Sequence, residues 1–234
     1  MKLISKTQGG GKWSVLNYND LMSQRFVAIS KDELASLEVA RFSGEIKIIE
    51  NEADIPDAVN ELRKEKMVGF DTETKPSFRK GQYHNVALIQ FATSEKAFPF
   101  RINKTGFSRH LIDFFEDNEI LKIGLSTRDD FLNLNRQCKF EPQNFIEIQN
   151  YVKDFLITDN SLSKIYAILF GKRISKGQRL TNWEDDCLSE AQQDYAALDA
   201  SACLEIYNYL REGKFNPMSS LYYKEISEEE SSLS

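Results

Sequence analysis

Apolar residues recur in short runs along most of this chain, separated by polar stretches and by stretches with helical periodicity. The runs rich in β-branched and aromatic residues predict strands at residues 46–50, 67–76, 86–92, 96–102, 120–125 and 145–148. The helical periodicity predicts helices at residues 55–66, 107–116, 126–138, 162–170 and 190–211. Short connections between the strands from residue 67 to residue 102 favour antiparallel neighbours, and strands then alternate with helices. This order predicts a mixed α/β domain.

The strand at residues 67–76 places two carboxylates on one face. Because strand side chains alternate, Val68 and Phe70 point to one side of the strand. The other side carries Gly69, Asp71 and Glu73. We expect open space beside the glycine, and repulsion between the two acids that a hard divalent cation would remove. The alternative is a strand that simply runs out into a polar turn.

The helix predicted at residues 190–211 carries another unexpected carboxylate. Ser189 and Gln192 form a capping box at its start, and its apolar stripe includes Tyr195 and Asp199, four residues apart. An unpaired carboxylate within an apolar stripe is unfavourable, so a positive group must meet Asp199. A metal ion meets this need, and an ion pair with a core arginine is the alternative.

Residues 122–131 join the end of a strand to the start of a helix and include Asp129 and Asp130. Ligands bind at the carboxyl ends of strands in α/β sheets, and Asp130, next to Phe131, is better placed than Asp129 to turn inward. The alternative is a helix cap, because acidic residues favour helix N-termini and Ser126 with Asp129 resembles a capping pair.

Cations gather in two segments of the chain. The first segment, residues 171–179, contains glycines and lies close in sequence to Trp183. Its cations are Lys172, Arg173, Lys176 and Arg179. Two more come directly after the carboxylate strand, namely Arg79 and Lys80. Cations at this density suit the phosphates of a nucleic acid. A solvated charged face is the alternative.

Composition narrows the classes of protein further. The 234 residues carry a formal net charge of −6, which argues against a surface that coats nucleic acid generally but permits a local basic patch. No apolar run approaches the ~20 residues that cross a bilayer. Three cysteines without metal-type spacing predict reduced thiols in a cytoplasmic protein. The two histidines disfavour a histidine-rich zinc site.

The order of the acids and the tyrosine resembles that of the DEDDy 3′–5′ exonucleases, and most of all the ribonuclease D and Werner-type exonuclease group. The motifs that carry the resemblance are Asp71-x-Glu73, Lys122-x-Gly124, Asp130 and Tyr195-x-x-x-Asp199. The resemblance covers residues 46–212 and implies a ribonuclease-H-like fold, in which three antiparallel strands and then parallel strands form a mixed sheet flanked by α-helices. Residues 1–45 are then an N-terminal extension, partly flexible, and residues 213–234 an acidic tail rich in serine and glutamate that we predict to be disordered.

The resemblance also implies catalysis with two magnesium or manganese ions. By this likeness Asp71, Glu73 and Asp199 would hold the first ion, and Asp71 would bridge to the second. Asp130 would contribute directly or through water, and Tyr195 would orient the attacking water.

Together these features favour an enzyme, a metal-dependent 3′–5′ exonuclease acting on DNA or RNA, with nucleic acid as its partner and no membrane association. Thr72 would offer its backbone to the terminal nucleotide, while the cations of both basic segments would contact the substrate. A non-cleaving nucleic-acid-binding module on the same fold is an alternative, although the complete acid set favours cleavage. A hydrolase of short oligonucleotides is another alternative. A calcium-binding role lacks an EF-hand-like loop.

Overall fold

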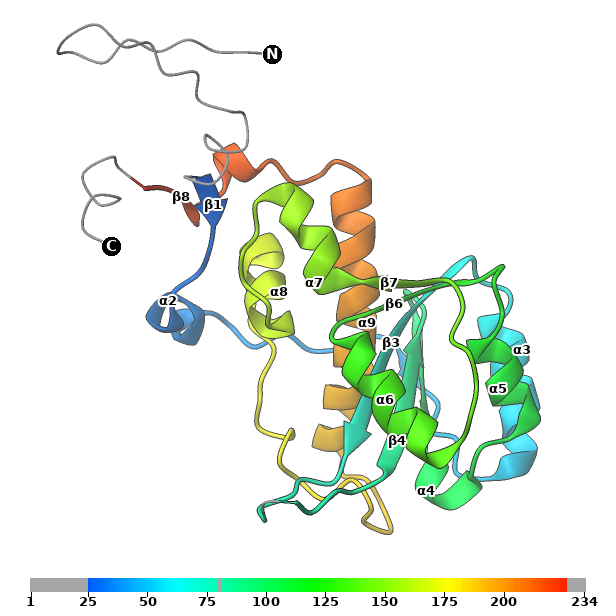
Figure 1. Ribbon diagram of the computed structural model, residues 1–234. Coiled ribbons are helices and arrows are strands. Elements are labelled where there is room, and N and C mark those ends of the chain that lie inside the picture. Colours follow the sequence, from blue (N-terminus) through cyan, green and yellow to red (C-terminus); the bar gives the residue numbers. More distant parts are fainter. Residues whose placement is uncertain (1–24, 80, 227–234) are drawn as a thin grey trace, which may run out of the picture.

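The computed structural model of the protein describes residues 25–79 and 81–226 (Figure 1). Its centre is a mixed sheet with the strand order β2-β5-β4-β3-β6-β7. The strands are β2 (Glu45–Ile46), β3 (Met67–Thr74), β4 (Val86–Ala92), β5 (Lys96–Phe100), β6 (Leu121–Gly124) and β7 (Phe145–Glu147). β3, β4 and β5 form an antiparallel meander, and β6 and β7 continue the sheet in parallel from β3. The predicted mixed sheet is therefore confirmed.

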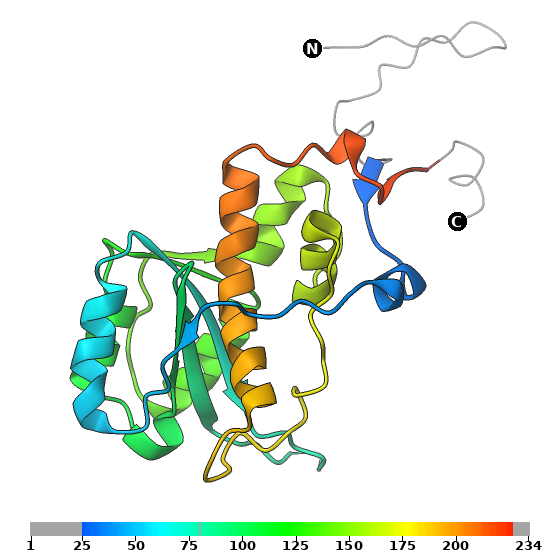
Figure 2. The ribbon, with the colours of Figure 1, turned by 180° about the vertical axis from the view of Figure 1, so that it is seen from behind.

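Helices cover both faces of this sheet. One face packs against α3 (Ile55–Leu62), α5 (Arg109–Phe115) and α6 (Thr127–Gln137). The long helix α9 (Glu190–Arg211) crosses the other face (Figure 2), with α7 (Ile148–Tyr151) and α8 (Leu162–Phe170) against it. Shorter elements that the sequence analysis did not predict are η1 (Glu52–Asp54), α4 (Ile102–Thr105) and η2 (Val152–Phe155). None of the described helices is both long and apolar enough to span a bilayer.

Phenylalanine rings fill the space between the sheet and the α3, α5 and α6 layer. Phe70 of β3 is fully buried there. The centroid of its ring lies between 5.4 and 6.0 Å from those of Phe91, Phe115, Phe131 and Phe145. Such tilted, stacked and edge-to-face pairs add stabilisation beyond the burial of apolar area. The predicted orientation of Phe70 is confirmed, and alternation then directs Asp71 to the opposite face, toward α9.

Lys122 of β6 is buried in the same phenylalanine-rich layer. Its ammonium group lies 5.5 Å from the ring centroid of Phe114 and 5.2 Å from that of Phe145. It donates hydrogen bonds to the backbone carbonyls of Asp117, Ile120 and Gln143. A buried cation needs such partners. Because Lys122 lies on the face of the sheet away from Asp71, this motif residue supports the core rather than lining the acidic site.

Segments outside residues 46–212 also form structure. β1 (Arg25–Val27) pairs antiparallel with β8 (Tyr223–Glu225), and α2 (Lys31–Ser36) and η3 (Pro217–Ser219) lie beside them in the chain. Val27 is fully buried, and its amide donates to the carbonyl of Leu156 at 2.7 Å. Residues 25–45 and 213–226 belong to the segments expected to be a partly flexible extension and a disordered tail, and backbone pairing and apolar burial hold these described parts against the domain. Residues 1–24 and 227–234 lie outside the described part.

Candidate active site

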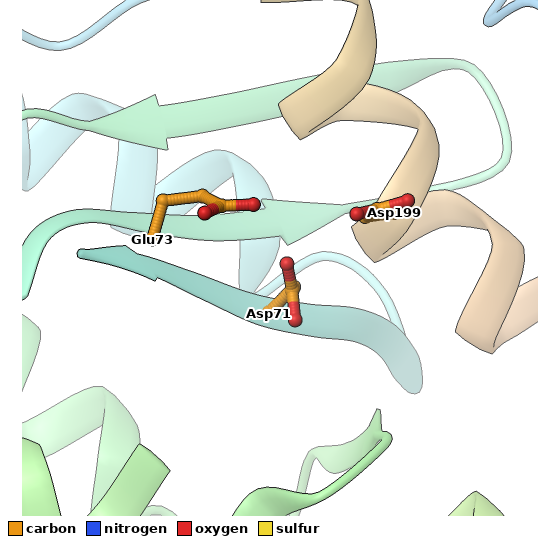
Figure 3. Close-up of side chains that lie close together, drawn as sticks. All are labelled: Asp71, Glu73 and Asp199. Atoms are coloured by element: carbon orange, nitrogen blue, oxygen red, sulfur yellow. The ribbon is translucent and has the colours of Figure 1, made fainter. Parts of the chain in front are cut away.

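Three carboxylates meet where α9 crosses β3. Asp71 and Glu73 extend from the strand, and Asp199 extends from the helix toward them (Figure 3). One oxygen from each carboxylate lies within 4.8 Å of the other two. Glu73 is 8% exposed and Asp199 is 7% exposed, whereas Asp71 is half-buried.

Gly69 brings the helix and the strand into this contact. A Cβ atom at this position would lie 1.9 Å from the carbonyl oxygen of Ala200, the residue after Asp199. The space beside Gly69, which the sequence analysis expected to be open, is therefore filled by the backbone of α9. Only a residue without a side chain permits so close an approach. This contact sets the distance between Asp199 and the carboxylates of β3.

Burial raises the pKa values of all three acids, and repulsion from neighbouring carboxylates adds to the shift at Asp71 and Glu73. Burial, and then the charges of Asp199 and Glu73, raise the pKa of Asp71 well above its usual range. Burial and the charge of Asp199 raise the pKa of Glu73 to about 9, against the lowering effect of Arg179. Burial raises the pKa of Asp199 to about 7, with a hydrogen bond from Tyr195 as the opposing influence. The cluster therefore favours a cationic group that would restore full ionisation.

The donor set fits a hard divalent cation. Carboxylate oxygens are the ligands that magnesium and manganese prefer. Among the described residues, Oδ1 of Asp199 is fully buried and has no hydrogen-bond partner. A buried carboxylate oxygen without a partner is unfavourable, and coordination by a metal would satisfy it. This observation favours the metal over the alternative of a core arginine, since no ion pair of Asp199 occurs in the part of the chain that the structure describes.

Asp130 lies in the same pocket, outside the group of three. Its Oδ1 accepts a hydrogen bond of 2.5 Å from the hydroxyl of Thr72, the residue between the two acids of β3. Burial raises the pKa of Asp130 to about 7, although the bond from Thr72 opposes this shift. The predicted inward turn of Asp130 thus places it beside β3, and the Thr72 side chain has a role that the sequence analysis did not foresee.

Glu147 holds the N-terminus of α6, which carries Asp130. Its carboxylate accepts hydrogen bonds from the amides of Ser126 and Thr127, at 3.0 and 2.8 Å, and from the Thr127 hydroxyl at 2.9 Å. The side-chain cap by Ser126, the alternative considered for this segment, does not form, because Ser126 adopts a left-handed conformation with φ of 63°. Glu147 was missed, and its position at the end of a parallel strand is the signal that could have identified it.

Tyr195 lies one helical turn before Asp199 on the same side of α9. Its ring packs against fully buried Trp183, with centroids 6.0 Å apart. Burial and the nearby charges of Asp199 and Glu73 raise the pKa of Tyr195 far above its usual value, so the hydroxyl keeps its proton at neutral pH. The side chain therefore presents a fixed O–H group at the edge of the acid cluster.

These side chains line one pocket with a volume of about 380 Å³. All five predicted catalytic residues are on its wall, namely Asp71, Glu73, Asp130, Tyr195 and Asp199. Thr72, Lys176 and Arg179 line it as well, so two cations of the segment 171–179 face the acids. The pocket also includes polar side chains that the sequence analysis missed, those of Asn160, Ser161, Ser163 and Ser175.

The other predicted cations lie elsewhere. Arg173 donates from Nε to the carbonyl of Leu37 and does not line the pocket, because this contact ties it to the N-terminal segment. Lys172 is exposed beside it, also away from the pocket lining. Arg79 lines a neighbouring groove. Lys80 lies outside the described residues.

Comparisons with known proteins agree with this geometry. A family model described as 3′-5′ exonuclease matches residues 46–213. The mouse bifunctional 3′-5′ exonuclease/ATP-dependent helicase WRN is 33% identical over 150 residues, which cover 62% of this chain and 11% of that protein. A 3′-5′ exonuclease of Arabidopsis thaliana is 29% identical over 151 residues, which cover 62% of this chain and 52% of that protein. The chain thus spans at most about half the length of these two curated relatives.

The EXO domain of Nibbler from Aedes aegypti shares the fold, with a TM-score of 0.66 at 20% identity over 77% of this chain and 96% of that chain. The matched family region contains the acid cluster and nearly all of the central sheet. Sequence motif, fold and clustered carboxylates agree with one another, and the chain belongs to the 3′–5′ exonuclease family.

Proposed function

We propose that this protein is a metal-dependent 3′–5′ exonuclease that removes nucleotides from the 3′ end of DNA or RNA with two bound magnesium or manganese ions. The observation that carries the proposal is the convergence of four carboxylates, from β3, α6 and α9, in one pocket whose rim carries Lys176 and Arg179. Divalent ions bound at such a site activate water, neutralise the phosphate and stabilise the leaving oxygen.

Residues of the chain supply the positioning. Asp71, Glu73 and Asp199 would hold one ion, and Asp71 with Asp130 would face the other. Asp130 is held in place by the Thr72 hydroxyl. Arg179 lies close enough to lower the pKa of Glu73, so its guanidinium is near the position of a bound phosphate. The protonated hydroxyl of Tyr195, held against Trp183, would orient the attacking water.

The direct test uses 5′-labelled single-stranded DNA and RNA with magnesium, manganese or chelator, and wild-type protein beside Asp71→Asn. We expect a ladder that shortens from the 3′ end, requires the metal and is absent with the variant. An intact label in all lanes with binding retained would instead support the non-cleaving module. A series of chain lengths in the same assay separates an exonuclease from a hydrolase that acts only on short oligonucleotides.

A further inference from the structure

One wall of the catalytic pocket is made of two segments on either side of α8. Residues 160–163 lie at the start of this helix and residues 174–179 come after its end, and side chains of both segments line the pocket. We call these two segments the α8 wall. The hydroxyl of Ser163 donates to the carbonyl of Ile174 at 2.9 Å and so joins them. The second segment carries the two cations that line the pocket, Lys176 and Arg179.

The N-terminal segment, residues 25–41, contacts the α8 wall at two places. The first contact is at Asp159, directly before residues 160–163. Its carboxylate accepts a hydrogen bond of 3.0 Å from the amide of Ile29 and one of 2.6 Å from the ammonium group of Lys164. The acid therefore joins the N-terminal segment to the start of α8.

Arg173 makes the second contact, directly before residues 174–179. Its amide donates to the carbonyl of Glu38 at 2.9 Å, and its carbonyl accepts from the amide of Ala40 at 2.9 Å. Its side chain donates from Nε to the carbonyl of Leu37 at 3.1 Å. Three hydrogen bonds thus fix this one residue to the N-terminal segment.

The N-terminal segment is itself fixed to the core. Ile29 is 2% exposed and Ala40 is 5% exposed, and further apolar side chains, those of Leu34 and Leu37, pack against the same core cluster as α8 and α9. Figure 2 shows this segment in blue, passing from α2 across α9 toward the sheet. It can therefore hold the wall at a defined distance from the helix that carries Asp199.

The α8 wall is not packed tightly from behind. A cavity of about 200 Å³ lies between residues 39–41 and the start of α9, and Ser175, Gln178 and Tyr195 line it. Ser175 and Tyr195 also line the catalytic pocket, so open space adjoins the wall on two sides. Dispersion contacts are lost where a cavity replaces neighbouring atoms. Hydrogen bonds such as those of Arg173 therefore have a larger part in fixing the wall.

We propose that the N-terminal segment, which precedes the region that matches the exonuclease family, takes part in substrate binding by holding the α8 wall in position. Arg173 is a positioning residue, which keeps Lys176 and Arg179 facing the pocket, where they meet phosphates of the substrate. The proposal rests on the proposed exonuclease function. It assigns to Arg173 an effect on KM rather than on the chemical step, because the four acids extend from β3, α6 and α9.

The test is steady-state cleavage of a labelled single-stranded oligonucleotide with magnesium, by wild-type protein, Arg173→Met and Lys172→Met. Both substitutions remove one positive charge, and Arg173→Met also removes the hydrogen bond to the carbonyl of Leu37. It should raise KM by roughly 2- to 10-fold, the range that corresponds to one lost hydrogen bond, and leave kcat unchanged. Lys172→Met, the matched control, should keep the wild-type KM. Arg173→Lys keeps the charge and a donor and should recover part of the loss.

A double-mutant cycle shows whether Arg173 acts through the wall. With Lys176→Met and Arg179→Met already in place, Arg173→Met should raise KM no further, because the cations that it positions are gone. Additive rises would mean that Arg173 acts on the substrate by itself, and a lower Tm with unchanged KM would mean structural support alone. Either result, or equal KM values for Arg173→Met and Lys172→Met, would overturn the proposal.

Failure of the proposed function would give a different result. Wild-type protein without metal-dependent cleavage would refute the exonuclease activity, and the dissociation constant for the same oligonucleotide, measured by fluorescence anisotropy, would then take the place of KM. Arg173→Met should weaken this binding by the same factor. Asp159→Ala removes the acceptor of the Ile29 amide and should weaken it independently. Unchanged binding by both variants would contradict a role of the N-terminal segment in substrate binding.

Discussion

Gly69→Ala is the substitution that tests most directly how the active site is assembled. The added Cβ would lie 1.9 Å from the carbonyl oxygen of Ala200, whereas ordinary contacts begin at 3.4 Å. The backbones of β3 and α9 would have to separate by about 1.5 Å, because neither contacting atom belongs to a flexible side-chain end. That movement would carry Asp199 away from Asp71 and Glu73.

Two effects of this movement can be given magnitudes. Overpacking of a well-packed interior costs roughly 1–3 kcal/mol, which corresponds to a fall in Tm of about 2–12 °C for a chain of this size. Misplacement of a catalytic group by ~1 Å can reduce the rate about 100-fold. We therefore expect Gly69→Ala to remain folded, to lose about two orders of magnitude in kcat, and to show a smaller rise in Tm with magnesium than the wild type.

The assays are single-turnover cleavage of labelled oligonucleotide and thermal melting with and without magnesium. Gly177→Ala is the matched control, because its Cβ would meet only the Ser175 hydroxyl oxygen, at an ordinary 3.4 Å. Wild-type kcat and Tm for Gly69→Ala would refute the reasoning, since they would mean that the close approach of α9 does not set the geometry of the acids.

Further predictions concern charge and buried contacts. The pKa of Glu73 (about 9) and that of Asp199 (about 7) lie above the values of 4.5 and 3.8 expected in an unfolded chain. At pH values between the unfolded and the folded pKa of each acid, the metal-free folded protein therefore binds more protons than the unfolded chain. Its stability should fall as the pH rises from about 4 to 9, and millimolar magnesium should flatten this trend in melting experiments. Asp199→Asn should raise the free energy of unfolding of the metal-free protein at pH 8 by roughly 1–3 kcal/mol, which a higher Tm would show. The same melts should show no stabilisation of this variant by magnesium. Arg101→Met should lower stability by about 3–5 kcal/mol in denaturant titrations, because this fully buried guanidinium donates to Glu50 and to the carbonyls of Asp185 and Asp186. A milder loss is expected for the partly exposed Lys104→Met, which shares two of those acceptors, and equal losses would argue against the buried contact.

Local patterns predicted much of the fold and of the site. The two periodicities, of strand and helix, placed Asp71 and Asp199 on inward faces, and a carboxylate on an inward face is a signal that a single sequence can carry. The capping box of Ser189 and Gln192 forms as predicted, and α9 spans the predicted residues. Each of these features depends on residues close together in the chain.

Features that depend on contacts between distant segments were not predicted. The cations of segment 171–179 are close together in the sequence, but they lie apart in the structure. Arg173 donates to the carbonyl of Leu37, whereas Arg179 lines the pocket that contains the acids. The sequence shows a glycine at position 69, but only the docking of α9 shows why a side chain there is excluded. Glu147 caps a helix that begins about twenty residues earlier, and no local motif marks such a pair.

The pairing of β1 with β8 makes the path of the chain nearly circular. Arg25 and Glu225 are directly opposed across the two strands, in register and joined by an ion pair of 3.3 Å. A short linker could therefore join these positions, and new ends could be opened at the exposed turn around Gly106, between α4 and α5. Such a circular permutant would keep the sheet and the pocket while changing the order in which they are synthesised. We therefore expect the contacts between the elements, rather than the order in which they are joined, to determine this fold.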